Sequence, residues 1–368
     1  MKKKKSIKIC IVVGTRPEII KMAPIINYCS RKKIKYFIVN TAQHYDYMMS
    51  KVFFDELGLS RPKYNLDATK GTHGEETAEM ILFIEKVLHK EKPDVVLVQG
   101  DTNTVLSGAL AAVKMHIRIG HVEAGLRSFD ERMPEEINRT LADHMATFLF
   151  APTALAKMNL LRDGISEKKI FVVGNTIVDA VCAYSEVKHV PLCHGVCFGL
   201  HFPKGSYILA TLHRAENVDV KGTLRQILKG IELVHRRFGM PVVCPIHPRT
   251  QKMIKKFRLS VPQGVKLIEP VGYVHLLHLL KNARLVLTDS GGLQEECCIL
   301  KTPCVTMRLS TERSETVNVG ANIIAGTKAL DILKSAETMA NKRAKWQNPF
   351  GDGKTSERII KILLGKLG

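Results

Sequence analysis

The strongest constraint on the fold is a regular alternation of short β-branched runs with amphipathic stretches along the 368-residue chain. In the front half, strand-length runs lie at Lys8–Val13, Tyr36–Asn40, Asp94–Val98, Ile117–Val122, Phe148–Ala151 and Ile170–Val173. Between them, apolar residues at helical spacing predict helices over Pro17–Ser30, Gly74–His89, Thr104–Met115 and Glu135–His144. Strands that alternate with helices in this way favour a parallel sheet covered by helices on both faces.

The alternation breaks at Val187–Ser206, where Pro and Gly accumulate, and then restarts. Its second half predicts strands Tyr207–Leu212, Pro241–Ile246, Val265–Ile268, Leu285–Thr288 and Cys304–Met307, with helices Lys221–Phe238 and Gly291–Leu300. We therefore expect an α/β protein with two Rossmann-like, doubly wound parallel-sheet domains that face a cleft. The expected domains are residues 1–186, with a C-terminal helix at 354–368 packing back on them, and a nucleotide-binding domain at 187–353.

Composition narrows the choice of partner. Lys and Arg number 55 against 35 Asp and Glu, a formal charge of +20, while 45% hydrophobic and 24% charged residues exclude a disordered or fibrous chain. No apolar run reaches the roughly 18 residues of a membrane span, and no cleavage site follows the basic start, so we expect a cytoplasmic protein without a membrane partner. The positive charges are scattered and lack an aromatic–basic RNA signature, which favours small anions over nucleic acid.

Motifs for metals and common cofactors are weak. The nine cysteines form no spaced framework, which favours reduced, mostly buried thiols. One cluster resembles a metal site only loosely, because no second Cys-x-x-Cys pair accompanies it: His189, Cys193, His194, Cys197 and His201. Gly353-Lys354-Thr355 resembles the end of a P-loop, but no strand precedes it, and Gly-x-Gly-x-x-Gly does not follow the first strand. We therefore expect neither a metal nor a cofactor.

Polar residues cluster where the predicted strands end. In the front half they are Gly14–Glu18, Gln99–Thr102 and Glu123–Arg127, and in the back half they are His213–Glu216, His247–Arg249 and Asp289–Gly292. Ligands of doubly wound sheets bind beyond the carboxyl ends of the strands. We therefore expect two sets of loops, one per domain, to face each other across the cleft.

The back half carries a candidate phosphate site. Ser290, Gly291 and Gly292 follow a predicted strand and open a helix, where free backbone N–H groups attract anions and glycine allows close approach. Glu295 and Glu296 follow about one turn later, where a carboxylate can accept hydrogen bonds from ribose. Four cations are candidates to hold a diphosphate, although each alone is equally consistent with a surface charge: Arg16, Lys21, His213 and Arg313.

The front half carries candidate acid and base groups, namely Asp101, Glu123 and Glu135. Carboxylates that directly follow apolar strands are partly desolvated, and we expect burial to raise their pKa values toward the working range. Asp101 alone is also consistent with a helix cap, and Glu135 with a first-turn carboxylate favoured by the helix dipole.

Nine ordered motifs extend over nearly the whole chain: GTRPEIIKMAP from Gly14, TAQH from Thr41, GDTNTVL from Gly100, HVEAGLRS from His121, PEEINR from Pro134, GNTIVDA from Gly174, HRAEN from His213, TDSGGLQEE from Thr288 and TER from Thr311. With them the chain resembles the non-hydrolysing UDP-N-acetylglucosamine 2-epimerases. The resemblance implies a GT-B-like fold, a homodimer, and cofactor-free interconversion of UDP-N-acetylglucosamine and UDP-N-acetylmannosamine for polysaccharide biosynthesis. The implied route eliminates UDP, forms a glycal and re-adds UDP.

The resemblance also implies roles for single residues. Asp101, Glu123 and Glu135 exchange the proton, and His213 contacts the diphosphate and assists its departure. The implied phosphate-binding residues are Arg16, Lys21, Ser290, Gly291, Gly292 and Arg313, and Glu296 holds the ribose. Gln43 and His44 match a region that binds a second substrate molecule as an effector, or they form a simple strand-end turn.

Other functions remain open from the sequence. A hydrolysing epimerase would release N-acetylmannosamine and UDP, but those enzymes resemble this chain less in the first loop and at GDTNTVL. A retaining nucleotide-sugar glycosyltransferase would keep the fold, but its acceptor loops need not carry three acids. A non-catalytic nucleotide-sugar sensor or a nucleic-acid binder is suggested only by the charge of +20.

Overall fold

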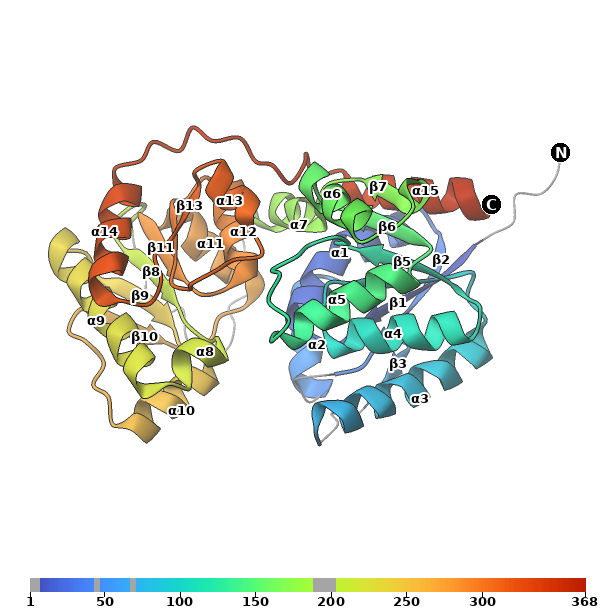
Figure 1. Ribbon diagram of the computed structural model, residues 1–368, viewed down its shortest axis with the longest axis horizontal. Coiled ribbons are helices and arrows are strands. Elements are labelled where there is room, and N and C mark those ends of the chain that lie inside the picture. The colour runs from blue at the N-terminus through green and yellow to red at the C-terminus, as the bar shows by residue number, and fades with distance from the viewer. Residues whose placement is uncertain (1–6, 43–46, 67–70, 188–202) are drawn as a thin grey trace. The chain divides into compact units, whose positions relative to one another are not determined.

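The structure is a computed structural model that describes residues 7–42, 47–66, 71–187 and 203–368. The predicted effector residues Gln43 and His44 and the Cys/His cluster at 189–201 lie outside the described residues. The chain divides into two compact units, of which the first contains the residues up to Cys182 together with Phe350–Gly368 and the second contains Ala183–Pro349. Each unit is an α/β domain (Figure 1).

The first unit is built on a parallel sheet of seven strands in the order β3-β2-β1-β4-β5-β6-β7. The strands are β1 Lys8–Val13, β2 Lys35–Asn40, β3 Tyr64–Asn65, β4 Val95–Gln99, β5 Arg118–Val122, β6 Phe148–Ala151 and β7 Ile170–Val172. The helices are α1 Arg16–Arg31, α2 Tyr47–Glu56, α3 His73–Glu91, α4 Asn103–Lys114, α5 Pro134–Met145, α6 Ala154–Arg162, α7 Thr176–Tyr184 and α15 Thr355–Leu367, with a 3-10 turn at Glu167–Lys169. All six strands predicted for this half are confirmed within one residue.

The second unit repeats this design with six parallel strands in the order β10-β9-β8-β11-β12-β13. They are β8 Ile208–Thr211, β9 Val242–Pro245, β10 Val265–Ile268, β11 Leu285–Thr288, β12 Cys304–Thr306 and β13 Asn322–Ile324. The helices are α8 Ala215–Val218, α9 Lys221–Phe238, α10 Pro248–Phe257, α11 Tyr273–Asn282, α12 Gly291–Leu300, α13 Ser314–Asn318 and α14 Ala329–Ala340. The prediction of two doubly wound parallel sheets is confirmed.

Apolar runs become central strands because helices cover both faces of each sheet. Every residue of β4 is buried, and so is every residue of β11, as a parallel sheet requires. In each sheet the strand order reverses once, between β1 and β4 and between β8 and β11. Loops that leave these neighbouring strands diverge, and the crevice they leave is the usual ligand site of such sheets.

The C-terminal helix α15 belongs to the first unit and packs against α1. The carboxylate of Asp179 accepts hydrogen bonds from the backbone N–H groups of Thr355 and Ser356 at 3.1 and 2.9 Å and from the Ser356 hydroxyl at 2.7 Å. The amino end of α15, at the P-loop-like Gly353-Lys354-Thr355, is therefore already occupied by a carboxylate. Among the described residues, no helix combines the length and the apolar character that a membrane span requires.

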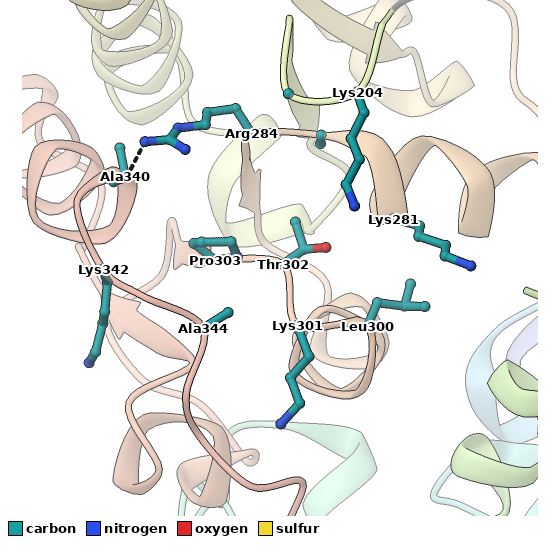
Figure 2. A pocket seen from close by; sticks show the side chains of 12 residues that line it. Lys204, Lys281, Arg284, Leu300, Lys301, Thr302, Pro303, Ala340, Lys342 and Ala344 are labelled. Carbon is teal, nitrogen blue, oxygen red and sulfur yellow. Dashed lines mark hydrogen bonds between the residues drawn. The ribbon is translucent and has the colours of Figure 1, made fainter.

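A basic cavity of about 350 Å³ lies at the amino-terminal edge of the second sheet (Figure 2). Its cations are Lys204, Lys281, Arg284, Lys301 and Lys342. Helices α11, α12 and α14 all end beside it, and cations are stabilising at helix carboxyl ends. Arg284 donates to the Ala340 carbonyl at 2.7 Å, and Lys301 donates to the Trp346 carbonyl. Because the cations lie at these three helix ends, we interpret the cluster as stabilising the helix carboxyl ends.

Candidate active site

In the first unit, Glu18 joins the two loops at the strand-order reversal. Its Oε2 accepts hydrogen bonds from the N–H groups of Gly14 and Thr15 at 2.6 and 2.9 Å, and its Oε1 accepts the hydroxyl of Thr102, next to Asp101. Burial raises the pKa of Glu18 to about 7, although these three hydrogen bonds oppose the rise. Sequence reasoning missed this residue, but the Thr15-x-x-Glu18 spacing of a capping box was a signal for it.

Glu123, one of the three predicted acid/base candidates, follows β5 and faces Lys21. The ammonium nitrogen of Lys21 lies 2.6 Å from Glu123 Oε2, and the Gln99 side-chain amide donates to the same oxygen at 2.8 Å. All three side chains are buried, and two donors at one oxygen favour the ionised carboxylate. Glu123 also has a φ of 71°, and non-glycine residues held in this region cluster at functional sites. The structure thus places Lys21, predicted as a phosphate contact, against an acid/base candidate.

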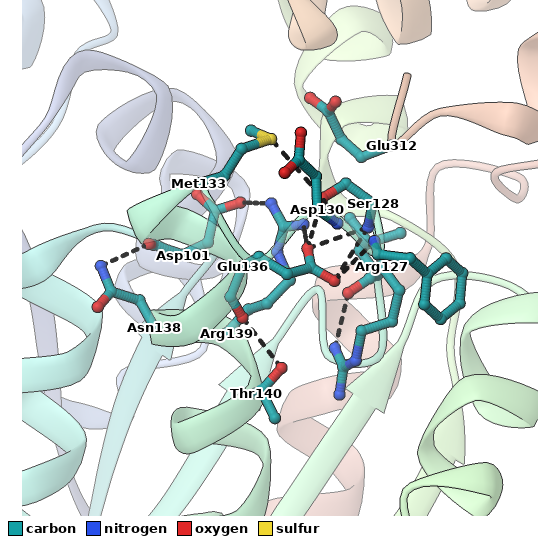
Figure 3. A network of polar contacts seen from close by, with 12 residues as sticks. Asp101, Arg127, Ser128, Asp130, Met133, Glu136, Asn138, Arg139, Thr140 and Glu312 are labelled. Atoms are coloured by element: carbon teal, nitrogen blue, oxygen red, sulfur yellow. Dashed lines mark hydrogen bonds and ion pairs between the residues drawn. The ribbon is translucent and has the colours of Figure 1, made fainter. Parts of the chain in front are cut away.

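Asp101 is held by helix α5 (Figure 3). The Arg139 guanidinium forms ion pairs with Asp101 through one nitrogen and with Glu136 through another, and the Asn138 amide donates to the Asp101 carbonyl at 3.1 Å. Arg139 and Glu136 are almost fully buried. Sequence reasoning did not single out either residue, although both belong to the PEEINR motif together with the predicted Glu135.

The Glu136 carboxylate also holds the loop that precedes α5. It accepts the N–H groups of Ser128 and Phe129, each at 3.0 Å, and the Ser128 hydroxyl at 2.8 Å (Figure 3). Phe129 has a φ of 59° and a side chain 73% exposed, which is an unfavourable conformation for a bulky residue. The network thus fixes the Asp101 loop and the 128–129 loop together.

Glu135 and Arg16 are both at helix starts. Glu135 is the second residue of α5 and is half-buried, one position before Glu136. Arg16 begins α1, so that Pro17 is the second helical residue rather than the first as predicted, and Thr15 is the N-cap. The guanidinium carbon of Arg16 lies 5.0 Å from the centre of the Phe53 ring, which orients the cation at the carboxyl edge of β1.

A buried imidazolium lies beneath the Asp101 loop. His121 Nδ1 lies 2.7 Å from Asp143 and its Nε2 lies 2.8 Å from the Gly100 carbonyl. Both nitrogens face acceptors, so both carry protons. Burial lowers the pKa of His121, but the Asp143 charge and the two hydrogen bonds outweigh it and raise the pKa above its ordinary value. Asp143 also pairs with Arg127 at 2.7 Å.

In the second unit, His213 and Asp289 come from the two loops at the strand-order reversal. His213 Nδ1 lies 2.9 Å from Asp289 Oδ1, and the His213 and Arg214 N–H groups donate to the Asp289 carboxylate at 2.9–3.1 Å. Burial alone would raise the pKa of Asp289, but the His213 and backbone hydrogen bonds hold it below its usual range. Sequence reasoning placed Asp289 in a strand-end loop but gave it no role.

The predicted phosphate loop opens α12. Ser290 is the N-cap of this helix. Within the described part of the chain, the Ser290 side chain makes no capping hydrogen bond, and the first turn of α12 contains no acidic residue. A Cβ atom on Gly291 would lie 2.4 Å from Glu312 Oε1, so any larger residue would force the Glu312 carboxylate to shift. Glu312 is buried with Arg308 at 2.9 Å and Arg214 at 3.6 Å. Burial opposes ionisation, but the arginine charges hold the pKa of Glu312 well below its usual range.

Arg313 and the Glu295–Glu296 pair lie beside this loop. Arg313 Nε is 3.1 Å from Glu295 Oε1, and all three side chains are buried. The structure thus brings His213, Ser290–Gly292, Arg313 and Glu296 to one edge of the second sheet and Asp101, Glu123, Lys21 and Arg16 to one edge of the first. Among the residues that the structure describes, no three His, Cys, Asp or Glu side chains group as a metal site would.

Two doubly wound units with polar loops at their strand-order reversals define an enzyme of the GT-B-like, nucleotide-sugar class. A family model described as UDP-N-acetylglucosamine 2-epimerase matches residues 27–364, and the chain belongs to this family.

Three relatives support this assignment. The chain is 54% identical over 360 residues to the UDP-N-acetylglucosamine 2-epimerase of Methanocaldococcus jannaschii, covering 97% of this chain and 98% of that protein. It is 43% identical to a UDP-2,3-diacetamido-2,3-dideoxy-D-glucuronate 2-epimerase of Pseudomonas aeruginosa, over 97% and 99% of the two chains. A crystal structure of the M. jannaschii UDP-GlcNAc 2-epimerase in complex with UDP-GlcNAc and UDP has a TM-score of 0.90 and 54% identity, over 97% and 99% of the two chains.

Proposed function

We propose that the protein interconverts UDP-N-acetylglucosamine and UDP-N-acetylmannosamine by epimerisation at C2, without net hydrolysis. Family membership and the relatives support the reaction class. The observation that carries the proposal is the pair Asp101 and Glu123, each a carboxylate held against a buried cation at the carboxyl edge of one sheet. Carboxylates kept ionised beside a sugar can accept a proton from carbon once that proton has been acidified.

The proposed reaction begins when the bond between C1 and the diphosphate oxygen breaks and the electron pair leaves with UDP. Positive character on the ring acidifies the C2 proton, and a carboxylate removes it to give a glycal. Protonation of C2 from the opposite face and re-addition of UDP at C1 complete the inversion. Asp101, Glu123 and Glu135 are the proposed groups for these proton transfers.

For the leaving diphosphate we propose the amino end of α12 at Ser290, Gly291 and Gly292, where backbone N–H groups stabilise anions. Arg16, His213 and Arg313 add positive charge, and Glu296 accepts hydrogen bonds from the ribose. Because its ammonium contacts Glu123, Lys21 is proposed to hold that carboxylate ionised rather than to bind phosphate directly. Gln43 and His44 stay a prediction for an effector site.

The decisive test incubates the protein with UDP-N-acetylglucosamine alone in deuterated water and follows C2 by NMR. Epimerisation predicts deuterium at C2 and the appearance of UDP-N-acetylmannosamine. Accumulation of free N-acetylmannosamine with UDP would indicate the hydrolysing reaction, and bound nucleotide sugar without exchange would indicate a glycosyltransferase. The same assay with UDP-2,3-diacetamido-2,3-dideoxy-D-glucuronate tests the substrate named for the P. aeruginosa relative.

A cytoplasmic homodimer is the proposed assembly. Apolar side chains are exposed one turn apart on α5, where Ile137 and Leu141 are 51% and 46% accessible, and solvent-exposed apolar groups of this kind favour association. Light scattering should give twice the chain mass of 41.1 kDa. Leu141→Glu should reduce it to one chain, whereas Leu330→Glu, a change at an exposed leucine of α14 in the other unit, should leave the dimer intact.

A further inference from the structure

The contact between His213 and Asp289 constrains the protons of the imidazole. Asp289 is fully buried, and its carboxylate is an acceptor only. The 2.9 Å contact therefore requires His213 Nδ1 to carry a proton. With Nδ1 fixed as a donor, the proton that His213 can give or take is the one on Nε2. The side chain is 35% exposed although its Nδ1 is bonded to a buried group.

We propose that Asp289 is a positioning residue that locks His213 in the Nδ1–H tautomer and presents its Nε2 to the diphosphate. The inference rests on the proposed function and deepens it. In the elimination, His213 reacts as the imidazolium: the proton on Nε2 passes to the phosphate oxygen that receives the electron pair of the broken C1–O bond, and His213 becomes the neutral Nδ1–H imidazole. In re-addition the same oxygen returns that proton to Nε2 as it bonds to C1, so protons and electrons balance over the cycle.

The anchoring of Asp289 fits this role. The Asn217 side-chain amide donates to Asp289 Oδ2 at 3.2 Å and to the Met307 carbonyl at 2.9 Å, which ties the carboxylate to the end of β12. Three further donors, the His213 and Arg214 N–H groups and His213 Nδ1, leave the carboxylate little freedom to turn. A ring held by such a carboxylate keeps one orientation while its Nε2 changes protonation state.

Other charged or titratable groups face His213 as well. The rings of His213 and His247 are 5.7 Å apart, and His247 Nδ1 accepts the Arg249 N–H at 3.2 Å, so a neutral His247 carries its proton on Nε2. Arg214 lies next to His213 in the same loop, and its guanidinium is directed to Glu312. Because His213 Nδ1 already donates to Asp289, the tautomer of His213 is set by Asp289.

A direct test reads the tautomer in the wild-type protein by ¹⁵N NMR of the histidine rings, assigned with a His213→Gln variant. At alkaline pH we expect a protonated Nδ1 and an unprotonated Nε2 on His213. The Nε2–H tautomer would overturn the proposal whatever the activity. Because this measurement needs no turnover, it remains informative even if the C2-exchange assay contradicts the proposed function.

The kinetic test uses Asp289→Asn. The amide oxygen can still accept the backbone N–H groups, but its nitrogen donates to His213 Nδ1 and forces the wrong tautomer. We expect kcat for C2 exchange to fall about 10²-fold, a typical loss for general acid catalysis, with the UDP affinity unchanged. In a His213→Gln background the same change should cost less than about 3-fold, because residues acting as one unit are non-additive.

A matched control is Asp219→Asn, which removes an exposed ion pair with Arg249 near the same loop and should leave kcat unchanged. If Asp289→Asn lowers kcat by the same factor in the wild-type and His213→Gln backgrounds, Asp289 supports only the backbone of the His213 loop. That result would overturn the positioning role. An unchanged kcat in Asp289→Asn with the Nε2–H tautomer present would overturn it as well.

Discussion

The Lys21 ammonium nitrogen and Glu123 Oε2 are 2.6 Å apart, and both side chains are shielded from solvent. The pair joins the first helix of the chain to the loop after β5. A buried charge is costly unless it is paired, so each residue depends on the other. The contact supports the proposed role of Lys21 as the counter-ion of that acid.

We therefore predict that Lys21→Met lowers the free energy of unfolding by about 3–5 kcal/mol, since Glu123 is left buried without its partner. In the double variant Lys21→Met with Glu123→Gln, most of the lost unfolding free energy should be regained, but C2 exchange should stay absent. Urea unfolding of the three variants measures the effect. As a control, Lys63→Met removes an exposed lysine that pairs with Glu91 and should cost much less than Lys21→Met. Equal losses from both lysine variants would contradict the prediction.

The second prediction concerns Arg139, whose guanidinium pairs with both Asp101 and Glu136. Arg139→Lys keeps the charge but replaces a planar group with several donors by a single point charge, which cannot serve both carboxylates in the same geometry. We expect kcat to fall at least about 10-fold while UDP affinity stays within about 2-fold, because misplacing an acid/base group affects the chemical step more than binding. Isotope exchange and calorimetry measure the two quantities.

The control for Arg139 is Arg132→Lys, which changes an exposed arginine that pairs with Asp130 in the neighbouring loop. It should leave both kcat and UDP affinity unchanged. A parallel fall of kcat and UDP affinity in Arg139→Lys would show that the whole edge of the sheet had moved rather than Asp101 alone.

The sequence was enough to predict the strands that consist of a full apolar run, because a strand buried on both faces needs such a run. It did not predict β3 and β13, since strands of two and three residues carry too little pattern. Within the candidate site, the strand-end positions of Asp101, Glu123 and His213 follow from the alternation alone. The partners that fix these side chains do not, because Arg139 and Asp289 meet them only through the tertiary packing of distant segments.

The sequence also does not predict the partners of charged side chains. Sequence reasoning treats Lys21 and Arg313 alike as cations available for phosphate, because composition shows the sign of a charge but not its nearest neighbour. The structure places each against a buried carboxylate, Glu123 and Glu295 respectively. Glu18 was the reverse case: its capping-box spacing was visible in the sequence, but its bond to Thr102 on another loop was not.

A third prediction concerns pH. The pKa of His121 is raised in the folded protein, so its contribution to stability is fully present below the unfolded value of about 6.5 and is lost as pH rises through the folded pKa. The difference in unfolding free energy between wild type and His121→Gln should therefore be largest near pH 6 and shrink toward pH 9. Denaturant unfolding of both proteins across this range measures the difference, and a difference that grows with pH would refute the imidazolium assignment.

The last prediction tests how closely the first loop is packed. A Cβ atom on Gly14 would lie 2.1 Å from Thr41 Oγ1 and 2.2 Å from Thr104 Oγ1, two hydroxyls that bond each other at 2.8 Å. Both threonines are fully buried, so they cannot move aside without breaking that bond. We expect Gly14→Ala to cost about 1–3 kcal/mol of stability through overpacking.

Gly14→Ala should also lower kcat/KM, because it displaces the loop that carries Arg16 and the N–H groups bonded to Glu18. The matched change is Gly222→Ala in helix α9, where a Cβ atom would meet nothing within 4 Å. That variant should gain up to about 1 kcal/mol, since alanine is the better helix former, and keep full activity. Thermal unfolding and the exchange assay separate the two outcomes, and a Gly14→Ala protein as stable and active as wild type would mean that the two threonines are not held in place.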